Sequence, residues 1–151
     1  MATRGKSTAY KVKNPEKYVG NVDSIVCRSS WERFVCRHLD GNTNVRRWAS
    51  EEVVIPYKSP LDAQPHRYFV DFFVELNDGT RFLVEVKPFV QTQPPQMNES
   101  GRKTKRYAED CRTYSVNLAK WDAAKRWCDR NGMRFQIWTE NELRMIGHTT
   151  F

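Results

Sequence analysis

"YFVDFFVELNDGTRFLVEVKP", residues 68–88, contains two apolar runs that meet at the turn sequence Asn77-Asp78-Gly79. An Asp-Gly turn between such runs is typical of a β-hairpin, so the stretch predicts strands over residues 66–76 and 80–87. Three charged residues lie in the most apolar parts of these runs: Asp71 in the first, and Glu85 and Lys87 in the second. A buried carboxylate is costly unless a partner compensates its charge, and a bound cation is one such partner.

The spacing of these charges predicts that they converge. Residues i and i+2 of a strand share a face, so Glu85 and Lys87 point together while Val84 and Val86 point to the opposite layer. If the two strands pair, Asp71 comes alongside Glu85. Two neighbouring carboxylates repel each other unless a divalent cation bridges them, and Mg²⁺ binds with few protein ligands and takes phosphate oxygens. A lysine beside it stabilises charge on a phosphate or orients a water.

The remaining pattern predicts an α/β fold with a mixed central sheet flanked by helices. "RSSWERFVCRHLDGN" indicates a helix over about residues 30–40 with Ser29 or Ser30 as its N-cap. An apolar stretch at 53–57 predicts a strand before the hairpin. A long helix over about 105–131 and a strand at 133–138 follow, and the capping box formed by Thr139 and Glu142 opens a short final helix.

Composition fits one domain with a core of ordinary size, since the chain has 151 residues, of which 39% are hydrophobic. Residues 1–23 are polar and basic and are expected to form an arm, with a single domain over 24–151. Neither a membrane-spanning run nor the apolar region of a signal peptide is visible, so a cytosolic protein is expected. The four cysteines form no C-x-x-C pair and are expected to be reduced and mostly buried.

The net charge of +7 is unevenly distributed. Residues 1–47 contain ten Lys and Arg against four Asp and Glu, whereas residues 48–112 contain nine against ten. A basic rim around an acidic centre would attract a polyanion such as DNA, although basic surfaces are also common on soluble proteins.

Several further residues are candidates for this chemistry. Glu32, at the start of the first helix, has the alternative role of a charge favoured by the helix dipole. Lys120 on the long helix faces either the sheet or solvent, and either Glu51 or Glu52 is a candidate for an outer carboxylate. His38 and His66 lack a paired metal spacing and are interpreted as structural or surface residues. A basic cluster in a mobile loop is expected to contact phosphate: Arg102, Lys103, Lys105 and Arg106.

Asp71, then Glu85-Val86-Lys87 on the next strand, after a helix that carries Glu32, resemble the PD-(D/E)xK nuclease superfamily, with Val70 in place of the proline of that motif. Segments in order along the chain, including "NPEKYVGN", "RSSWERF", "WASEEVVIPYKSPLD", "HRYFVDFF" and "VEVKP", resemble the head completion nucleases of T-even-type tailed phages. The endonuclease subunits of transposons are similar in layout.

The resemblance implies a restriction-endonuclease-like α-β-β-β-α-β core and a DNA endonuclease that processes or secures the packaged DNA end before tail attachment. It implies Mg²⁺, with Mn²⁺ as a substitute, held by Asp71, Glu85, Glu32 and the carbonyl of Val86, beside the motif lysine Lys87. The implied partners are DNA, bound without reading its sequence, and phage head or portal proteins, in the cytoplasm of the infected cell or the virion head.

Three alternatives stay open at the level of sequence. In the first alternative, Asp71 and Lys87 form a buried ion pair and have no catalytic role. In the second, the protein is a non-catalytic head component that binds the DNA end or the portal. In the third, it is a junction-resolving or restriction-type nuclease that acts as a dimer.

Overall fold

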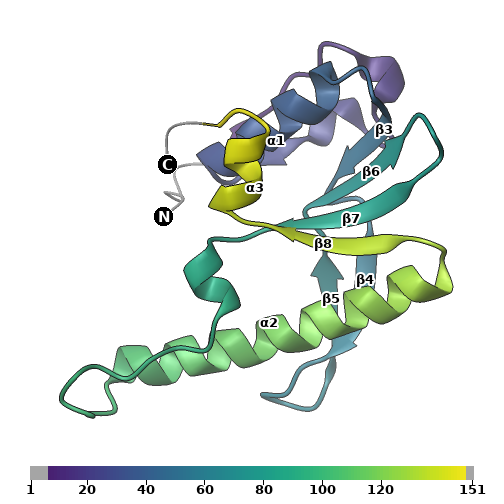
Figure 1. Ribbon diagram of the computed structural model, residues 1–151. Helices are drawn as coiled ribbons and strands as arrows, with labels where there is room; N and C mark the ends of the chain where they lie inside the picture. Colours follow the sequence, from purple (N-terminus) through teal and green to yellow (C-terminus); the bar gives the residue numbers. More distant parts are fainter. Residues whose placement is uncertain (1–6, 149–151) are drawn as a thin grey trace.

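A four-stranded mixed sheet forms the centre of the computed structural model, which describes residues 7–148 (Figure 1). Its strands, in spatial order, are β3 (Val45–Ser50), β6 (Phe72–Leu76), β7 (Arg81–Val86) and β8 (Arg134–Trp138). The first three are antiparallel to one another, whereas β7 and β8 are parallel. A parallel pair needs a long crossover, and helix α2 (Lys105–Arg130) provides it. The predicted mixed sheet flanked by helices is confirmed.

Two layers of helices cover the sheet on opposite faces. Helices α1 (Ser30–Gly41) and α3 (Glu140–Met145) lie on one side, and α2 lies on the other (Figure 1). Strand β7 shows the expected alternation, because Val84 is buried with α1 and α3 whereas Leu83 is buried against α2. The face shared by Leu83 and Glu85 is therefore the α2 face.

The predicted helices agree closely with the structure. Ser29 caps α1, and its hydroxyl accepts a hydrogen bond from the backbone amide of Glu32. Thr139 and Glu142 form the expected capping box at the start of α3. The segment before α2, expected to have no element, contains the short 3-10 helix η3 (Phe89–Thr92).

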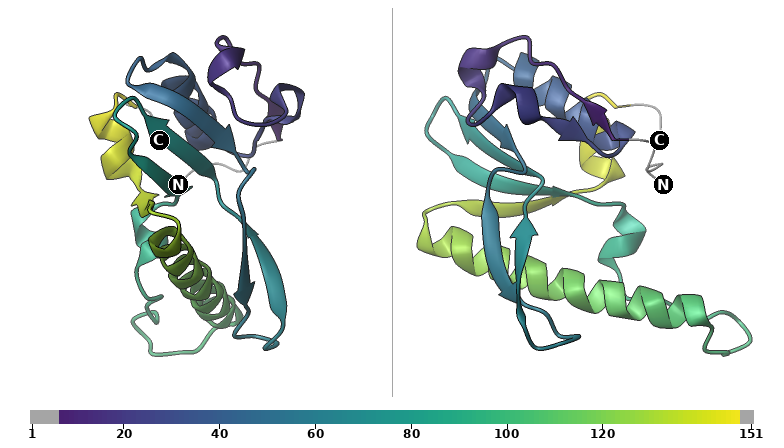
Figure 2. Two further views of the ribbon diagram at one scale, coloured as in Figure 1. Left: turned by 90° about the vertical axis from the view of Figure 1, so that its right-hand side faces the viewer. Right: turned by 180° about the vertical axis from the view of Figure 1, so that it is seen from behind.

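The strands before the hairpin differ from the prediction. The stretch expected as one strand over 66–76 is two strands, β5 (Pro65–Phe69) and β6, separated by Val70 and Asp71. Strand β5 pairs with β4 (Val54–Lys58), the apolar stretch predicted at 53–57, in a separate two-stranded sheet. Figure 2 shows β4 and β5 leaving the central sheet and crossing α2.

These pairings describe one ribbon with a bend. Ser50 pairs with Phe72 at the end of the β3–β6 ladder, and Val54 pairs with Phe69 at the start of the β4–β5 ladder. Between them Glu51 has a left-handed backbone (φ 54°), and its amide donates to the carbonyl of Asp71 at 3.0 Å. Left-handed backbone is strained in a non-glycine residue, so the bend is maintained by its surroundings. Asp71 lies outside both regular ladders as a result.

Strand β3 was not predicted, because a register shift between Val45 and Arg47 disrupts its alternation. Trp48 and Ala49 are both buried, while Arg46 and Arg47 are both exposed. Two exposed residues followed by two buried ones match neither the two-residue period of a strand nor the 3.6-residue period of a helix.

The chain before α1 packs on the body from residue 7 onward; residues 1–6 of the expected arm lie outside the described residues. It contains β1 (Thr8–Ala9), η1 (Pro15–Lys17), η2 (Val22–Ser24) and β2 (Val26–Cys27). The buried carboxylate of Asp40 accepts hydrogen bonds from the Tyr10 hydroxyl at 3.0 Å and from the backbone amide of Lys13 at 2.8 Å. Lys17 Nζ donates to the carbonyls of three residues at the end of α1, Leu39, Asp40 and Asn42, at 2.8–2.9 Å.

Three of the four cysteines, Cys27, Cys36 and Cys128, are buried as expected. Trp31 and Trp121 are core residues. No helix within residues 7–148 is both long and apolar enough to cross a membrane.

Lys17→Met is expected to destabilise the protein, because it leaves the last carbonyls of α1 without their charged donor. Hydrogen bonds to charged groups contribute roughly 1.5–3 kcal/mol, and partial exposure reduces the expected loss to about 1–2 kcal/mol. Chemical denaturation would measure the loss. Lys13→Met is the matched control, since the Lys13 side chain is exposed and only its backbone amide binds Asp40. Equal stabilities of the two variants would contradict the capping role.

Candidate active site

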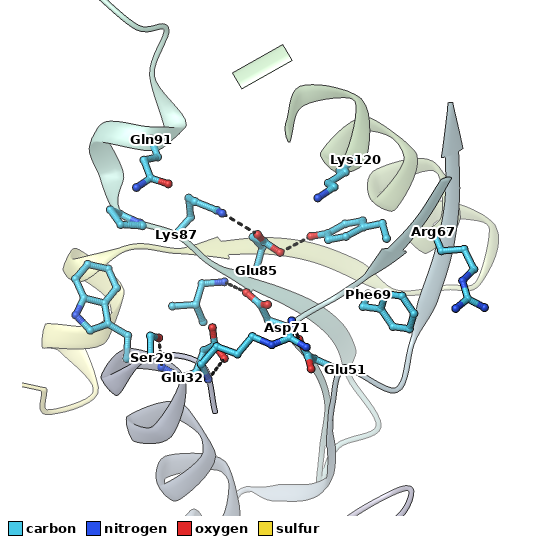
Figure 3. A pocket seen from close by; sticks show the side chains of 15 residues that line it. Ser29, Glu32, Glu51, Arg67, Phe69, Asp71, Glu85, Lys87, Gln91 and Lys120 are labelled. Atoms are coloured by element: carbon cyan, nitrogen blue, oxygen red, sulfur yellow. Dashed lines mark hydrogen bonds and ion pairs between the residues drawn. The ribbon is translucent and has the colours of Figure 1, made fainter. Parts of the chain in front are cut away.

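A pocket of about 320 Å³ opens where the bent ribbon, the start of α1 and the inner side of α2 meet (Figure 3). We call it the acidic pocket. Its lining includes the residues that the sequence placed at a catalytic or metal site, together with one of the predicted DNA contacts: Glu32, Asp71, Glu85, Val86, Lys87 and Lys120. The structure thus brings together residues from α1, from the bend between β5 and β6, from the end of β7 and from α2.

Glu85 is the most buried carboxylate of the pocket, with 7% of its surface exposed. The Tyr68 hydroxyl donates to its Oε2 at 2.5 Å, and Lys87 Nζ lies 3.4 Å from its Oε1. Burial is the largest cause that raises the pKa of Tyr68 far above its ordinary value, and the Glu85 carboxylate raises this pKa further. The Tyr68 hydroxyl therefore stays protonated and remains a donor. The two partners fix the orientation of Glu85 in the pocket.

Asp71 sits at the bend and projects into the pocket beside Glu85 (Figure 3). Its Oδ2 accepts a hydrogen bond from the backbone amide of Val86 at 2.8 Å. Desolvation raises the pKa of Asp71 well above its ordinary value, and the nearby carboxylates of Glu85 and Glu32 raise it further. The ionised form of Asp71 is thus disfavoured in the absence of an added positive charge.

Glu32 enters the pocket from the first turn of α1. Its Oε2 accepts a hydrogen bond from the backbone amide of Arg28 at 3.0 Å, so the structural role expected at a helix start is present. Desolvation raises the pKa of Glu32, and the carboxylates of Glu51 and Glu85 contribute in the same direction. Glu32 therefore belongs electrostatically to the same cluster.

Of the two glutamates proposed as an outer carboxylate, Glu51 lines the pocket and Glu52 contacts Tyr18 instead. Arg28 also lines the pocket, and its Nη1 lies 2.9 Å from Glu51 Oε1. This ion pair was not predictable from the sequence, because 23 positions separate its two members.

Lys120 faces the sheet rather than solvent. Its Nζ lies 5.6 Å from the ring centroid of Tyr68 and 5.8 Å from that of Tyr57. Cations are attracted to aromatic faces at such distances, so the two rings hold this ammonium group beside the acidic pocket.

Other candidates lie elsewhere. The lining of the acidic pocket contains none of the predicted basic cluster, whose members are all exposed: Arg102, Lys103, Lys105 and Arg106. The prediction of a loop was wrong for Lys105 and Arg106, which belong to the first turn of α2. His66 pairs with Asp62 near the far end of the β4–β5 ribbon, and His38 lies near Asn42 at the end of α1. Neither histidine lines the pocket.

Tyr68 is the principal site residue that the sequence did not predict. A tyrosine in an apolar strand looks like an ordinary core residue, and Tyr68 does pack with Ile55 and Trp121. Only its hydroxyl, which reaches Glu85 17 positions further along the chain, belongs to the site. A buried tyrosine hydroxyl needs a partner, but sequence does not reveal which one.

The donor set of the pocket suits a hard divalent cation. Within residues 7–148 no three His, Cys, Asp or Glu side chains gather into a ready-made metal cage. Mg²⁺ does not need one, because it binds through one or two carboxylates and completes its shell with waters and phosphate. Asp71, Glu85 and the carbonyl of Val86 supply only oxygens. Desolvation, and after it the neighbouring carboxylates, raises the pKa values of Asp71 and Glu32, so a bound cation would stabilise their ionised forms. These residues fit such an ion.

Comparison with known proteins gives two matches. The sequence profile of a family described as "TnsA-like endonuclease N terminal" matches residues 42–140, a span that includes Asp71, Glu85, Lys87 and Lys120 but not Glu32. The chain is also 38% identical over 149 residues, 97% of each chain, to the head completion nuclease of Enterobacteria phage T4.

Asp71→Asn is expected to raise the melting temperature of the metal-free protein at neutral pH. Folding raises the pKa of Asp71, so its ionised form opposes folding. The gain in stability of the variant over the wild type is smallest below about pH 4, the pKa of an aspartate in the unfolded chain. The gain increases as pH rises from there through the pKa of Asp71 in the folded protein. A gain of about 1 kcal/mol corresponds to roughly 2–4 °C in thermal unfolding with a chelator present.

Asp78→Asn, in the β6–β7 turn, is the matched control with the opposite sign. The backbone amide of Thr80 lowers the pKa of Asp78, so its ionised form favours folding and that contribution is lost as pH falls. This substitution is not expected to raise the melting temperature at neutral pH. A lower melting temperature for Asp71→Asn at neutral pH would mean that protein cations already compensate Asp71.

Proposed function

We propose, because this chain belongs to the TnsA-like endonuclease N-terminal family, that it hydrolyses DNA phosphodiester bonds in the acidic pocket with the help of a divalent cation. The observation that carries this proposal is the convergence of Asp71 and Glu85 beside Lys87, in a pocket where the pKa of Asp71 stays well above its ordinary value. The family supports the reaction class, and the residues and the ion are our assignment.

Asp71, Glu85 and the carbonyl of Val86 would hold Mg²⁺, with Mn²⁺ as a substitute, and Glu32 would reach the same ion from α1. When bound, such a cation neutralises charge on the scissile phosphate and acidifies a water. The hydrogen bond between Asp71 and the amide of Val86 links two of these groups directly, which keeps the carbonyl and the carboxylate in a fixed relation.

Lys87 is placed to act on the phosphate. Its backbone amide donates to the carbonyl of Trp138 at 2.9 Å, which holds the lysine to β8, and its ammonium lies beside Glu85. From this position it would orient a water or stabilise the charge that develops on the phosphate. Lys120, held over two tyrosine rings, would contact phosphate from the α2 side.

The biological role that we propose is the completion of phage heads. The T4 relative is named for this role, and the similarity to it extends over nearly the whole chain. In this role the packaged DNA end is the substrate, head or portal proteins are the partners, and the reaction takes place in the infected cell's cytoplasm or the virion head. The exposed basic residues at 102–106 would hold the DNA backbone without reading sequence.

Cleavage of linear, circular and branched DNA with Mg²⁺ would test the reaction. Asp71→Asn and Lys87→Ala are each expected to lower the rate by at least about 100-fold, since the first weakens the cation site and the second removes a positive charge that acts on the developing charge of the phosphate. A chelator is expected to abolish cutting by the wild type. Lys125→Ala, on the exposed side of α2, is the control. A wild type that binds DNA but is as inert as both variants would indicate a structural head component.

Tyr68→Phe is expected to raise the Mg²⁺ concentration needed for half-maximal cutting by about 10–100-fold. The substitution keeps the buried ring but removes the hydroxyl that orients Glu85, and loss of such partners typically weakens metal sites to this extent. Saturating Mg²⁺ should restore most of the rate. Tyr114→Phe, on α2 and outside the lining of the acidic pocket, is the control. An unchanged Mg²⁺ dependence would show that Tyr68 has only a packing role.

A further inference from the structure

A second cavity of about 550 Å³ continues the acidic pocket along α2. The two share Lys87, Gln91 and Lys120 in their linings, so they form one continuous depression. We call the second part the α2 cavity. It lies where the N-terminal half of α2 extends beyond the sheet toward η3 (Figure 1), and its volume is typical of ligand sites, about 300–1,000 Å³.

Asn117 is the unusual residue of the α2 cavity. The buried face of α2 continues from Cys128 through Ala124 and Trp121 to Asn117, where the helical period calls for an apolar side chain. Asn117 is 7% exposed, yet no group in the described part of the chain forms a hydrogen bond with its amide. The fully buried side-chain polar atoms that lack a partner in the described residues do not include this amide, so its polar atoms are open to the cavity. A group from outside the protein can form hydrogen bonds with them there.

The rest of the lining indicates the chemistry of that outside group. Arg112 and Lys120 supply positive charge on either side of Asn117 along the helix, and Gln91 supplies a second amide that both donates and accepts. Val116 and Leu61 supply apolar walls. Glu109 also lines the cavity, in the turn of α2 before Arg112, so an anion is favoured near Arg112 and Lys120 rather than there. Cations, amides and short apolar walls together suit a nucleotide, with its phosphates, base edge and sugar.

We propose that the α2 cavity holds the nucleotide next to the scissile phosphate, with Asn117 and Gln91 hydrogen-bonded to it and Arg112 in contact with the following phosphate. The proposal rests on the proposed function, because the acidic pocket fixes where the scissile phosphate lies. Lys87 and Lys120 line both the acidic pocket and the α2 cavity. The DNA strand would pass between them from one to the other. Asn117 is then a substrate-positioning residue rather than a catalytic one.

DNA binding by protein that carries Asp71→Asn, which separates binding from cutting, tests this proposal. With fluorescently labelled duplex and single-stranded DNA as probes, addition of Asn117→Leu is expected to weaken binding of at least one probe about five- to tenfold. The same substitution should leave the melting temperature unchanged or higher, because leucine places an apolar side chain on the buried face of α2. Gln91→Ala, on the exposed helix η3, is the second variant and should weaken binding without affecting the fold.

The salt dependence of binding tests Arg112 separately. Arg112→Ala is expected to reduce the slope of log Kd against log salt concentration by about 0.7–0.9, the contribution of one phosphate contact. Lys125→Ala removes a charge from the exposed side of the same helix and should leave this slope unchanged. Equal slopes for the two variants would overturn the assignment of Arg112.

Steady-state cutting by otherwise wild-type protein separates this proposal from the proposed function. Asn117→Leu should raise KM about five- to tenfold and change kcat less than twofold. If neither Asn117→Leu nor Gln91→Ala changes the KM of cutting or the Kd of the binding assay, the proposed role of the α2 cavity is overturned. The proposed nuclease function would stand in that case. If DNA binding depends on Asn117 but the protein has no nuclease activity, the proposed role of the α2 cavity is supported and the proposed function is overturned.

Discussion

Electrostatic repulsion among carboxylates is the constraint around which the centre of this protein is organised. Glu32, Asp71 and Glu85 arrive from a helix, a bend and a strand, and their charges oppose one another in a partly desolvated pocket. The chain compensates only in part, through the Tyr68 hydroxyl, the Val86 amide and the Lys87 ammonium. Hydrogen bonds orient these carboxylates, but a cation is what would remove their mutual repulsion.

The bend at Glu51 shows how the backbone serves this arrangement. A straight strand over 66–76 would place every side chain in a regular alternating position, with Asp71 inside the ladder. Instead the ribbon turns away, and Asp71 leaves the ladder and reaches the amide of Val86 on β7. The left-handed conformation of Glu51 is the local cost of that placement. The same bend carries β4 and β5 across α2 and brings Tyr68 to Glu85.

Sequence reasoning succeeded where local chemistry determines structure. The turn at Asp78-Gly79, the cap at Ser29 and the capping box at Thr139 each specify an element through neighbouring residues. The period of two in β7 was enough to place Glu85 and Lys87 on one face. Reasoning of this kind failed for β3, whose bulge disrupts the alternation, and for the bend, which depends on hydrogen bonds between residues twenty positions apart. Tyr68 and Arg28 were missed for the same reason, since their partners are distant in sequence.

Asn117 extends this reasoning from the acidic pocket to the groove beside it. Evolution toward stability alone would favour an apolar side chain at a buried helix position, just as it would favour an apolar one in place of Asp71. Asp71 and Asn117 are polar at positions where the periodicity of the surrounding sequence predicts an apolar side chain. Both line the same continuous depression. Departures from a local rule that cluster in space, rather than along the chain, point to a shared requirement. One DNA strand passing from the α2 cavity into the acidic pocket would meet that requirement, because it brings phosphate to the cation site and hydrogen-bonding groups to the amide.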